Sequence, residues 1–347
     1  MGPPILTLNS LPPLQDLLHP TPETYSQILT LWQYFAGFTI VLWLTTWFPM
    51  GKTSLKSSIF NIPGRLAWTT MELIAPLNLI YVMSALVAKL NTDLTSLPLP
   101  NQIVAALYLI HYANRAVISP LFAAPSMSPI HALIAVSGLA FNWINSTCLA
   151  AWLVGYHVPV TGYRTDEFGG LGDGTRPVIS DYLPYIGFIL FFVGMTGNII
   201  SERTFFRLRR EEANKLHTQK DHSKNPENKY SKIYVIPPTK GLFRFILYPH
   251  YVFEWLEWIG FILVGTAVYP ASDAVGPEMR LVSWLHPAAA LAERLRVPLP
   301  LPAVVFVVNV VTSMVPQARL GKRWYLGRFG KDKVAGRGAV VPFLGCL

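Results

Sequence analysis

The sequence predicts an all-α protein that crosses a membrane about seven times. Of its 347 residues, 52% are hydrophobic and only 14% are charged. The apolar residues gather in long runs, several of which reach the ~20 residues that a helix needs to span a bilayer. Almost all lysines and arginines lie in the connectors between these runs or in the C-terminal tail. This pattern is typical of a polytopic membrane protein.

Seven apolar runs are expected to form the spans, and the last of them is short. Residues 1–27 precede them as a lumenal N-terminal segment that lacks the basic start of a cleaved signal peptide. Residues 28–347 are expected to form one polytopic domain. The runs are Ile28 to Phe48, Leu66 to Leu90, Ile103 to Phe122, Ile130 to Val154, Tyr182 to Ile200, Phe253 to Val268 and Ala303 to Val315.

Lysine and arginine are distributed unevenly between the two sides of this predicted bundle. The connectors on one side, with the C-terminal tail, hold 21 of these residues, and the connectors on the other side hold five. Because such residues accumulate on the cytosolic side, we expect a lumenal N-terminus and a cytosolic C-terminus. The connector Ser201–Lys240 would then be cytosolic, with a basic helix that leaves the membrane and a mobile polar loop after it.

The segment GLFRFILYPHYVFEWLEWIG, from Gly241 to Gly260, places polar groups at the start of an apolar helix. Pro249 suits an early helical position, so His250, Glu254 and Glu257 recur at i, i+4 and i+7 on one face. Carboxylates at or just inside a bilayer surface are costly and usually functional. This face is therefore predicted to hold a polar ligand.

Further polar residues interrupt the other apolar runs. Glu72 follows Trp68 by four residues in the second run and shares its helical face. Tyr112 belongs to the sequence HYANR in the third run, where four polar residues cluster. Asn145 and Asn198 interrupt the fourth and fifth runs. Interhelical hydrogen bonding explains each of these alone, so the prediction of a functional site depends on the whole group.

Composition and spacing argue against several function classes. Two cysteines provide neither a disulfide framework nor a metal cluster, and no second histidine stands at metal-site spacing to His250. The net charge of +9 would suit nucleic acid, but basic residues confined to connectors favour a membrane surface or an anionic cofactor. We therefore expect the lipid bilayer as a partner, no metal, no nucleic acid and a monomer.

Six motifs carry a resemblance to a known family. They are AWTTMEL, HYANR, GMTGNIISE, YVIPPTKGLF, PHYVFEWLEWIG and RWYLGRF, spread over the chain from about Arg65 onward. Together they resemble the steroid 5α-reductase family of integral membrane proteins. The resemblance implies a seven-helix enzyme of the endoplasmic reticulum that uses NADPH to reduce the 4,5 double bond of a 3-oxo-4-ene steroid. Residues from about 182 to 347 would bind the cofactor.

The resemblance also implies roles for individual residues. Glu72 and Tyr112 match the family's acid and tyrosine that hold the steroid 3-ketone, and Trp68 matches a tryptophan of that pocket. The residues that match or stand at cofactor-binding positions are Asn145, Asn198, Glu202, Arg209, Tyr234, His250, Glu254, Glu257, Arg323 and Tyr325. The chain departs from the animal enzymes where Met71 replaces a glutamine, Glu202 an aspartate, His250 an asparagine and Gly321 a histidine.

The predicted acid and tyrosine have a chemical rationale. Hydride addition to an enone needs a nicotinamide beside the β-carbon and a hydrogen-bond donor for the charge that builds on the ketone oxygen. Tyr112 would donate to that oxygen, with Glu72 neutral and supporting it. Cytosolic arginines around Arg209 would bind the dinucleotide phosphates.

Other functions are compatible with parts of the sequence. An isoprenylcysteine-type membrane methyltransferase also has a proline-histidine-tyrosine signature before an acidic helix, but it needs no acid and tyrosine in the second and third spans. Within the reductases, a polyprenol or a trans-2-enoyl-CoA is an alternative substrate. A transporter or scaffold would leave the basic cluster and the aligned carboxylates without a role.

Overall fold

The computed structural model describes residues 14–45, 48–55, 58–164, 176–219, 229–230, 233–270 and 274–342. Within these ranges, the strands β1 (Asn61–Ile62) and β2 (Ile130–His131) form one antiparallel pair, and helices make up most of the rest. The predicted all-α fold class is confirmed. The longer helices are α2 (Pro22–Trp32), α5 (Gly64–Lys89), α6 (Leu99–Tyr112), the π-helix η4 (Ala113–Ala123), α7 (Ala132–Leu153), α8 (Ile179–Gln219), α9 (Pro249–Gly265), α10 (His286–Leu295) and α11 (Leu301–Val334). The short ones are α1 (Leu14–Leu18), α3 (Phe35–Phe38), α4 (Ile40–Leu44), η2 (Gly51–Thr53), η3 (Leu94–Ser96), η5 (Gly241–Phe243) and η6 (Ser283–Leu285).

Among the described residues, five helical segments are long and apolar enough to cross a membrane, so the chain is a multi-pass membrane protein. They are the run from α2 to α4 and the helices α5, α7, α8 and α11. The other two expected spans are helical but shorter or less regular. The third run divides into α6 and the π-helix η4, and α9 has 17 residues. Seven spans and the orientation of the termini stay predictions.

The first apolar run does not form one continuous helix. It begins at Pro22, earlier than the expected Ile28, and breaks into α2, α3 and α4. The first break follows Gln33, whose buried amide donates to the Arg280 carbonyl at 2.9 Å and accepts from the Val282 N–H at 3.0 Å. These hydrogen bonds fix Gln33 to a segment almost 250 residues away in the sequence. Local periodicity cannot predict a helix break that depends on such a distant contact.

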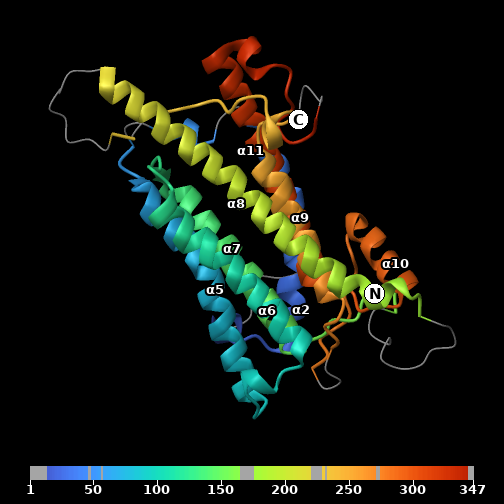
Figure 1. The fold of residues 1–347 in the computed structure, drawn as a ribbon. Coiled ribbons are helices and arrows are strands. Elements are labelled where there is room, and N and C mark those ends of the chain that lie inside the picture. Colours follow the sequence, from blue (N-terminus) through green and yellow to red (C-terminus); the bar gives the residue numbers. More distant parts are fainter. Residues whose placement is uncertain are drawn as a thin grey trace.

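Helices α8 and α9 lie side by side and pack closely (Figure 1). Glycines permit this approach, because a Cβ on Gly260 of α9 would overlap the backbone of Phe191, and a Cβ on Gly194 of α8 would overlap that of Glu257. Small residues at such contacts let the backbones of membrane helices come together. As a result, the amide of Asn198 on α8 reaches the carboxylate of Glu254 on α9.

Helices α8 and α11 extend past the bundle at one end of the molecule, and α10 lies at the other end (Figure 1). Because α8 continues without interruption to Gln219, the basic first half of the connector after the fifth span is helical, as predicted. Helix α11 continues to Val334 and is much longer than the expected run Ala303 to Val315. The predicted mobile loop at 217–232 lies largely outside the described residues, and its first three residues belong to α8 instead.

The segment after α11 folds back on the chain before α9. Gly338 forms a parallel bridge with Ile246, and the buried Arg337 donates to the carbonyls of Pro237 and Phe243 at 2.9 and 3.3 Å. A buried guanidinium needs acceptors of this kind to satisfy its donors. These contacts hold the YVIPPTKGLF segment against the end of α11.

Candidate active site

A cavity of about 500 Å³ lies among α3, α4, α5, α6, η4, α7, α9 and α11. This volume falls in the usual range of small-molecule pockets. The wall is mostly apolar, with the aromatic rings of Phe35, Phe38, Phe141, Trp258 and Phe306. Its polar side chains include Glu72, His111, Tyr112, Arg115, Asn142 and Glu254. A rigid apolar ligand with one polar end would match this distribution.

All three residues predicted to bind the substrate line this cavity. Trp68 and Glu72 lie one turn apart on α5, and Tyr112 is the last residue of α6. Glu72 is 9% exposed and Tyr112 is 3% exposed, so both polar groups are shielded from bulk solvent. The structure thus brings together, from two helices, the side chains that the sequence had placed in separate runs.

Asn142 of α7 stands between the predicted acid and tyrosine. Tyr112 Oη donates to Asn142 Oδ1 at 3.0 Å, while Asn142 Nδ2 donates to the Met71 carbonyl at 2.7 Å. The same Nδ2 lies 3.4 Å from Glu72 Oε2. The expected support of Tyr112 by Glu72 therefore passes through an amide.

Arg115 occupies the centre of a carboxylate cluster from α5, α8 and α9. Its guanidinium nitrogens lie 3.5 Å from Glu72, 3.4 Å from Glu202 and 3.8 Å from Glu254. The guanidinium also stacks on Trp68, with 4.7 Å from its carbon to the ring centre. Carboxylates gathered at one point repel each other unless a cation lies among them. Arg115 therefore joins the predicted substrate site and the predicted cofactor site in one network.

Helix α8 supplies Asn198 and Glu202 to this network. Asn198 Nδ2 donates to Glu254 Oε2 at 3.1 Å and to the His250 carbonyl at 3.2 Å. Glu202 Oε2 accepts from Ser119 Oγ of η4 at 2.9 Å. Three members of the predicted cofactor set, Asn198, Glu202 and Glu254, thus form one cluster beside the cavity.

Two other predicted cofactor residues lie behind the cavity wall. Glu257 is 1% exposed, and its Oε1 lies 2.8 Å from His111 Nδ1. The His111 ring packs on Trp258 with 4.4 Å between ring centres. Asn145 Nδ2 donates to Tyr108 Oη at 3.3 Å. Both contacts tie α6 to a neighbouring helix, and direct contact of Glu257 or Asn145 with a cofactor stays a prediction.

An outer group of predicted cofactor residues, Arg209, Tyr234 and Tyr325, lies toward the end where α8 and α11 extend. Arg209 Nε donates to the Ile233 carbonyl at 3.1 Å, and its two Nη atoms donate to the backbone and hydroxyl oxygens of Ser126. Tyr234 and Tyr325 lie within electrostatic range of Arg209. The guanidinium therefore fastens two connectors to α8, and its contact with a phosphate stays a prediction.

The other members of the predicted cofactor set surround this outer group. Tyr234 packs on Trp324 with 5.0 Å between ring centres, and Tyr325 is 1% exposed. Arg323, next to them on α11, is exposed. His250 lies in the first turn of α9. Its ring packs on Tyr248 with 5.6 Å between ring centres, and its carbonyl accepts from Asn198 of α8.

Sequence reasoning gave no role to three residues of this site: Arg115, His111 and Asn142. The first two belong to HYANR, a polar cluster that is unusual in an apolar run, but their partners lie on helices far away in sequence. Asn142 lies in the fourth run among apolar and small residues. Only its placement opposite Glu72 and Tyr112 distinguishes it from an asparagine that joins helices.

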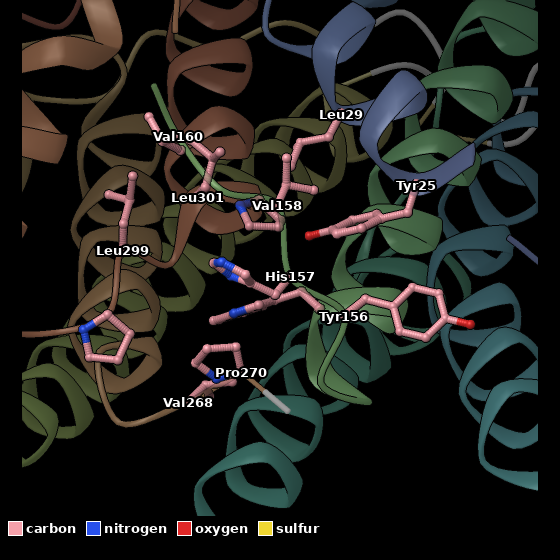
Figure 2. A pocket seen from close by; sticks show the side chains of 13 residues that line it. Tyr25, Leu29, Tyr156, His157, Val158, Val160, Val268, Pro270, Leu299 and Leu301 are labelled. Carbon is pink, nitrogen blue, oxygen red and sulfur yellow. The ribbon is translucent and has the colours of Figure 1, made fainter. Parts of the chain in front are cut away.

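A second cavity, near the start of α11, is too small to be a substrate site. It measures about 30 Å³ and is lined by Tyr25, Tyr156, His157 and apolar side chains (Figure 2). Since a water needs ~10 to 15 Å³ of such space, the cavity has room for a water or two. In the described part of the chain, no group of three or more His, Cys, Asp or Glu side chains is arranged to hold a metal ion.

Comparisons with known proteins lead to the family that the sequence motifs resemble. The family model described as 3-oxo-5-alpha-steroid 4-dehydrogenase matches residues 128–272. An uncharacterized protein of Schizosaccharomyces pombe is 29% identical over 336 residues, which cover 92% of this chain and 99% of that protein. Steroid 5-alpha-reductase DET2 of Solanum lycopersicum is 27% identical over 316 residues, covering 89% and 92%. For 3-oxo-5-alpha-steroid 4-dehydrogenase 1 of Bos taurus, the identity is 27% over 231 residues, covering 65% and 74%. In these matches, as in its sequence motifs, the chain is similar to the steroid 5α-reductase family.

Proposed function

We propose that this membrane protein reduces the 4,5 double bond of a 3-oxo-4-ene steroid with NADPH, in the endoplasmic reticulum membrane. The observation that carries the proposal is the 500 Å³ apolar cavity with Glu72 and Tyr112 in its wall. A steroid enone is an apolar, rigid molecule with a ketone at one end, so its shape and polarity match this cavity. Relatives named as steroid 5α-reductases support the same substrate class.

In this proposal, Tyr112 and Glu72 bind the ketone end of the substrate. Tyr112 Oη donates a hydrogen bond to the ketone oxygen, and this bond strengthens as negative charge develops there. Glu72 remains beside it, tied to Arg115 on one side and to Asn142 on the other. Trp68, held under the Arg115 guanidinium, forms a flat wall next to the reacting end. The apolar side chains around this end lower the local dielectric constant, which makes the hydrogen bond to the ketone stronger.

The chain's donors and acceptors fit a phosphorylated dinucleotide. NADPH, when bound, would supply the hydride for the β-carbon, and the α-carbon would take up a proton that comes from solvent. The carboxylates of Glu202 and Glu254 and the amide oxygen of Asn198 suit ribose hydroxyls or a carboxamide, because they offer several acceptor oxygens. Phosphates need fixed positive charge, and the extended end of α8 and α11 provides it with Arg203, Arg207, Arg210, Lys322 and Arg323.

The proposed topology has seven spans, a lumenal N-terminus and a cytosolic C-terminus, and the proposed state is a monomer. Helix α9 packs on α8 from His250 to Val264. Helix α6 contacts α5 and α9, and η4 contacts α5, which supports a place inside the bundle for these elements. The basic extensions of α8 and α11 lie at the same end of the molecule (Figure 1). That end would face the cytosol, where NADPH is available.

The test is an incubation of membranes containing the protein with tritiated NADPH and a panel of steroid enones, sterols, polyprenols and enoyl-CoAs. We expect tritium in a steroid product reduced at the 4,5 double bond, and none in matched membranes that carry Tyr112→Phe with Glu72→Gln. A parallel incubation with methyl-labelled S-adenosylmethionine examines the methyltransferase alternative. Label only in a polyprenol, an enoyl-CoA or a methylated product would contradict the proposed function.

A further inference from the structure

We infer that Asn142 is a positioning residue that sets the direction of the Tyr112 hydroxyl and holds Glu72 apart from it. The inference rests on the proposed function and adds to it a residue that lies opposite the acid and the tyrosine. Asn142 is 5% exposed, lines the cavity and contacts both groups. It acts on the substrate through Tyr112 and Glu72.

The orientation of the Asn142 amide follows from its partners. The Met71 carbonyl, 2.7 Å away, can only accept a hydrogen bond, so the nitrogen of the amide must face it. The amide oxygen then faces Tyr112 Oη, 3.0 Å away, and the hydroxyl must donate. A backbone carbonyl of α5 thus determines, through one side chain of α7, where the Tyr112 proton points.

This direction has consequences for the reaction. A tyrosine hydroxyl has one proton, and Glu72 Oε2 is another acceptor beside the same amide, 3.4 Å from Asn142 Nδ2. Without Asn142, the Tyr112 hydroxyl would be free to donate to the Glu72 carboxylate or to the neighbouring Tyr108 hydroxyl, and the donor for the ketone would be lost in an internal hydrogen bond. With Asn142 present, the Tyr112 hydroxyl donates to a neutral amide oxygen. An incoming ketone displaces the amide oxygen more easily than it would displace a carboxylate, because a hydrogen bond to an ionised acceptor is roughly twice as strong as one to a neutral acceptor.

Asn78 provides a matched control for a purely structural asparagine. It lies on α5, is 6% exposed and also joins α5 to α7, with Nδ2 donating to Ser146 Oγ at 2.8 Å and Thr147 Oγ1 at 2.9 Å. Unlike Asn142, it does not line the 500 Å³ cavity. Loss of either amide should weaken the contact between the two helices, but only loss of Asn142 should change the chemistry.

The experiment compares Asn142→Leu, Asn142→Ser and Asn78→Leu with the wild type, as purified protein in detergent. Leucine has nearly the shape of asparagine, and the serine hydroxyl is too short to reach Tyr112. Steady-state kinetics give kcat and KM for the steroid, NADPH fluorescence gives the cofactor Kd, and thermal unfolding reports the fold. We expect kcat to fall on the order of 10-fold to 10²-fold in both Asn142 variants, as for a misplaced reacting group. The NADPH Kd should not change, and Asn78→Leu should lower thermal stability at wild-type kcat.

A double variant separates positioning from helix contact. If Asn142 acts through Tyr112, then Asn142→Leu should reduce kcat little further once Tyr112→Phe is present. Losses that multiply, or wild-type kcat in a folded Asn142→Leu or Asn142→Ser protein, would overturn the inference and leave the proposed function standing. Absence of steroid reduction by the wild type would instead overturn the proposed function and the inference together.

Discussion

Replacing Arg115 with glutamine should destabilise the protein by about 3 to 5 kcal/mol, the usual penalty for breaking a buried ion pair by removing one partner. Arg115 is the cation for three carboxylates at 3.4 to 3.8 Å, and its side chain is 16% exposed. One such pair attracts by about 4 to 5 kcal/mol at an effective dielectric constant of about 20. The variant keeps Glu72, Glu202 and Glu254 close together without that attraction.

The assay is thermal unfolding of the purified protein in detergent, with Arg244→Gln as the control. Arg244 is exposed and stacks on Phe245 at 5.0 Å, so its loss should change stability by no more than about 0.5 kcal/mol. Arg115→Lys should lie between the wild type and Arg115→Gln, because one ammonium cannot serve three carboxylates as a guanidinium fork does. Adding Glu202→Gln to Arg115→Gln should restore part of the stability. A melting temperature of Arg115→Gln equal to that of Arg244→Gln would refute the network.

Three further predictions address the fold, the cofactor and the topology. Gly260→Leu should push α8 away from α9 and so lower the yield of folded protein and its affinity for NADPH, as measured by thermal unfolding and NADPH binding. The control Gly327→Leu, at an open position on α11, should change neither quantity. If the Arg209 guanidinium binds the 2′-phosphate, Arg209→Ala should raise the KM for NADPH more than the KM for NADH. An equal rise in both KM values would show that Arg209 has only a structural role. Protease added to sealed microsomes should cut within Ser201–Lys240, and protection of that connector would invert the topology.

Much of the fold was predictable because it depends on local patterns. Long apolar runs specified most of the helices, and a proline in the first turn specified the start of α9. Periodicity placed Trp68 and Glu72 on one face of α5, and both line the cavity. The basic run after the fifth span predicted a helix leaving the bundle, and α8 forms it. These features need no knowledge of other parts of the chain.

The rest depends on contacts between distant segments. The break after Gln33 follows from two hydrogen bonds to the segment before α10, and the amide alone does not reveal them. Helix α11 continues beyond the apolar run because its polar C-terminal half packs against other segments. A hydropathy pattern detects only the apolar half. Arg115 stood out in HYANR, yet its role depends on acids from three other helices. Asn142 gains its role only from the pair that it separates.

The most direct test of the account is the single-turnover rate of steroid reduction by purified, NADPH-loaded protein with Tyr112→Phe, Glu72→Gln and both together. If Tyr112 donates to the ketone and Glu72 supports it, each single variant should fold and bind NADPH normally while reduction slows on the order of 10² to 10³, about 2.7 to 4 kcal/mol. The double variant should lose less than the product of the two losses, because both groups act on one charge. Wild-type rates in both single variants would remove Tyr112 and Glu72 from the mechanism and contradict the account.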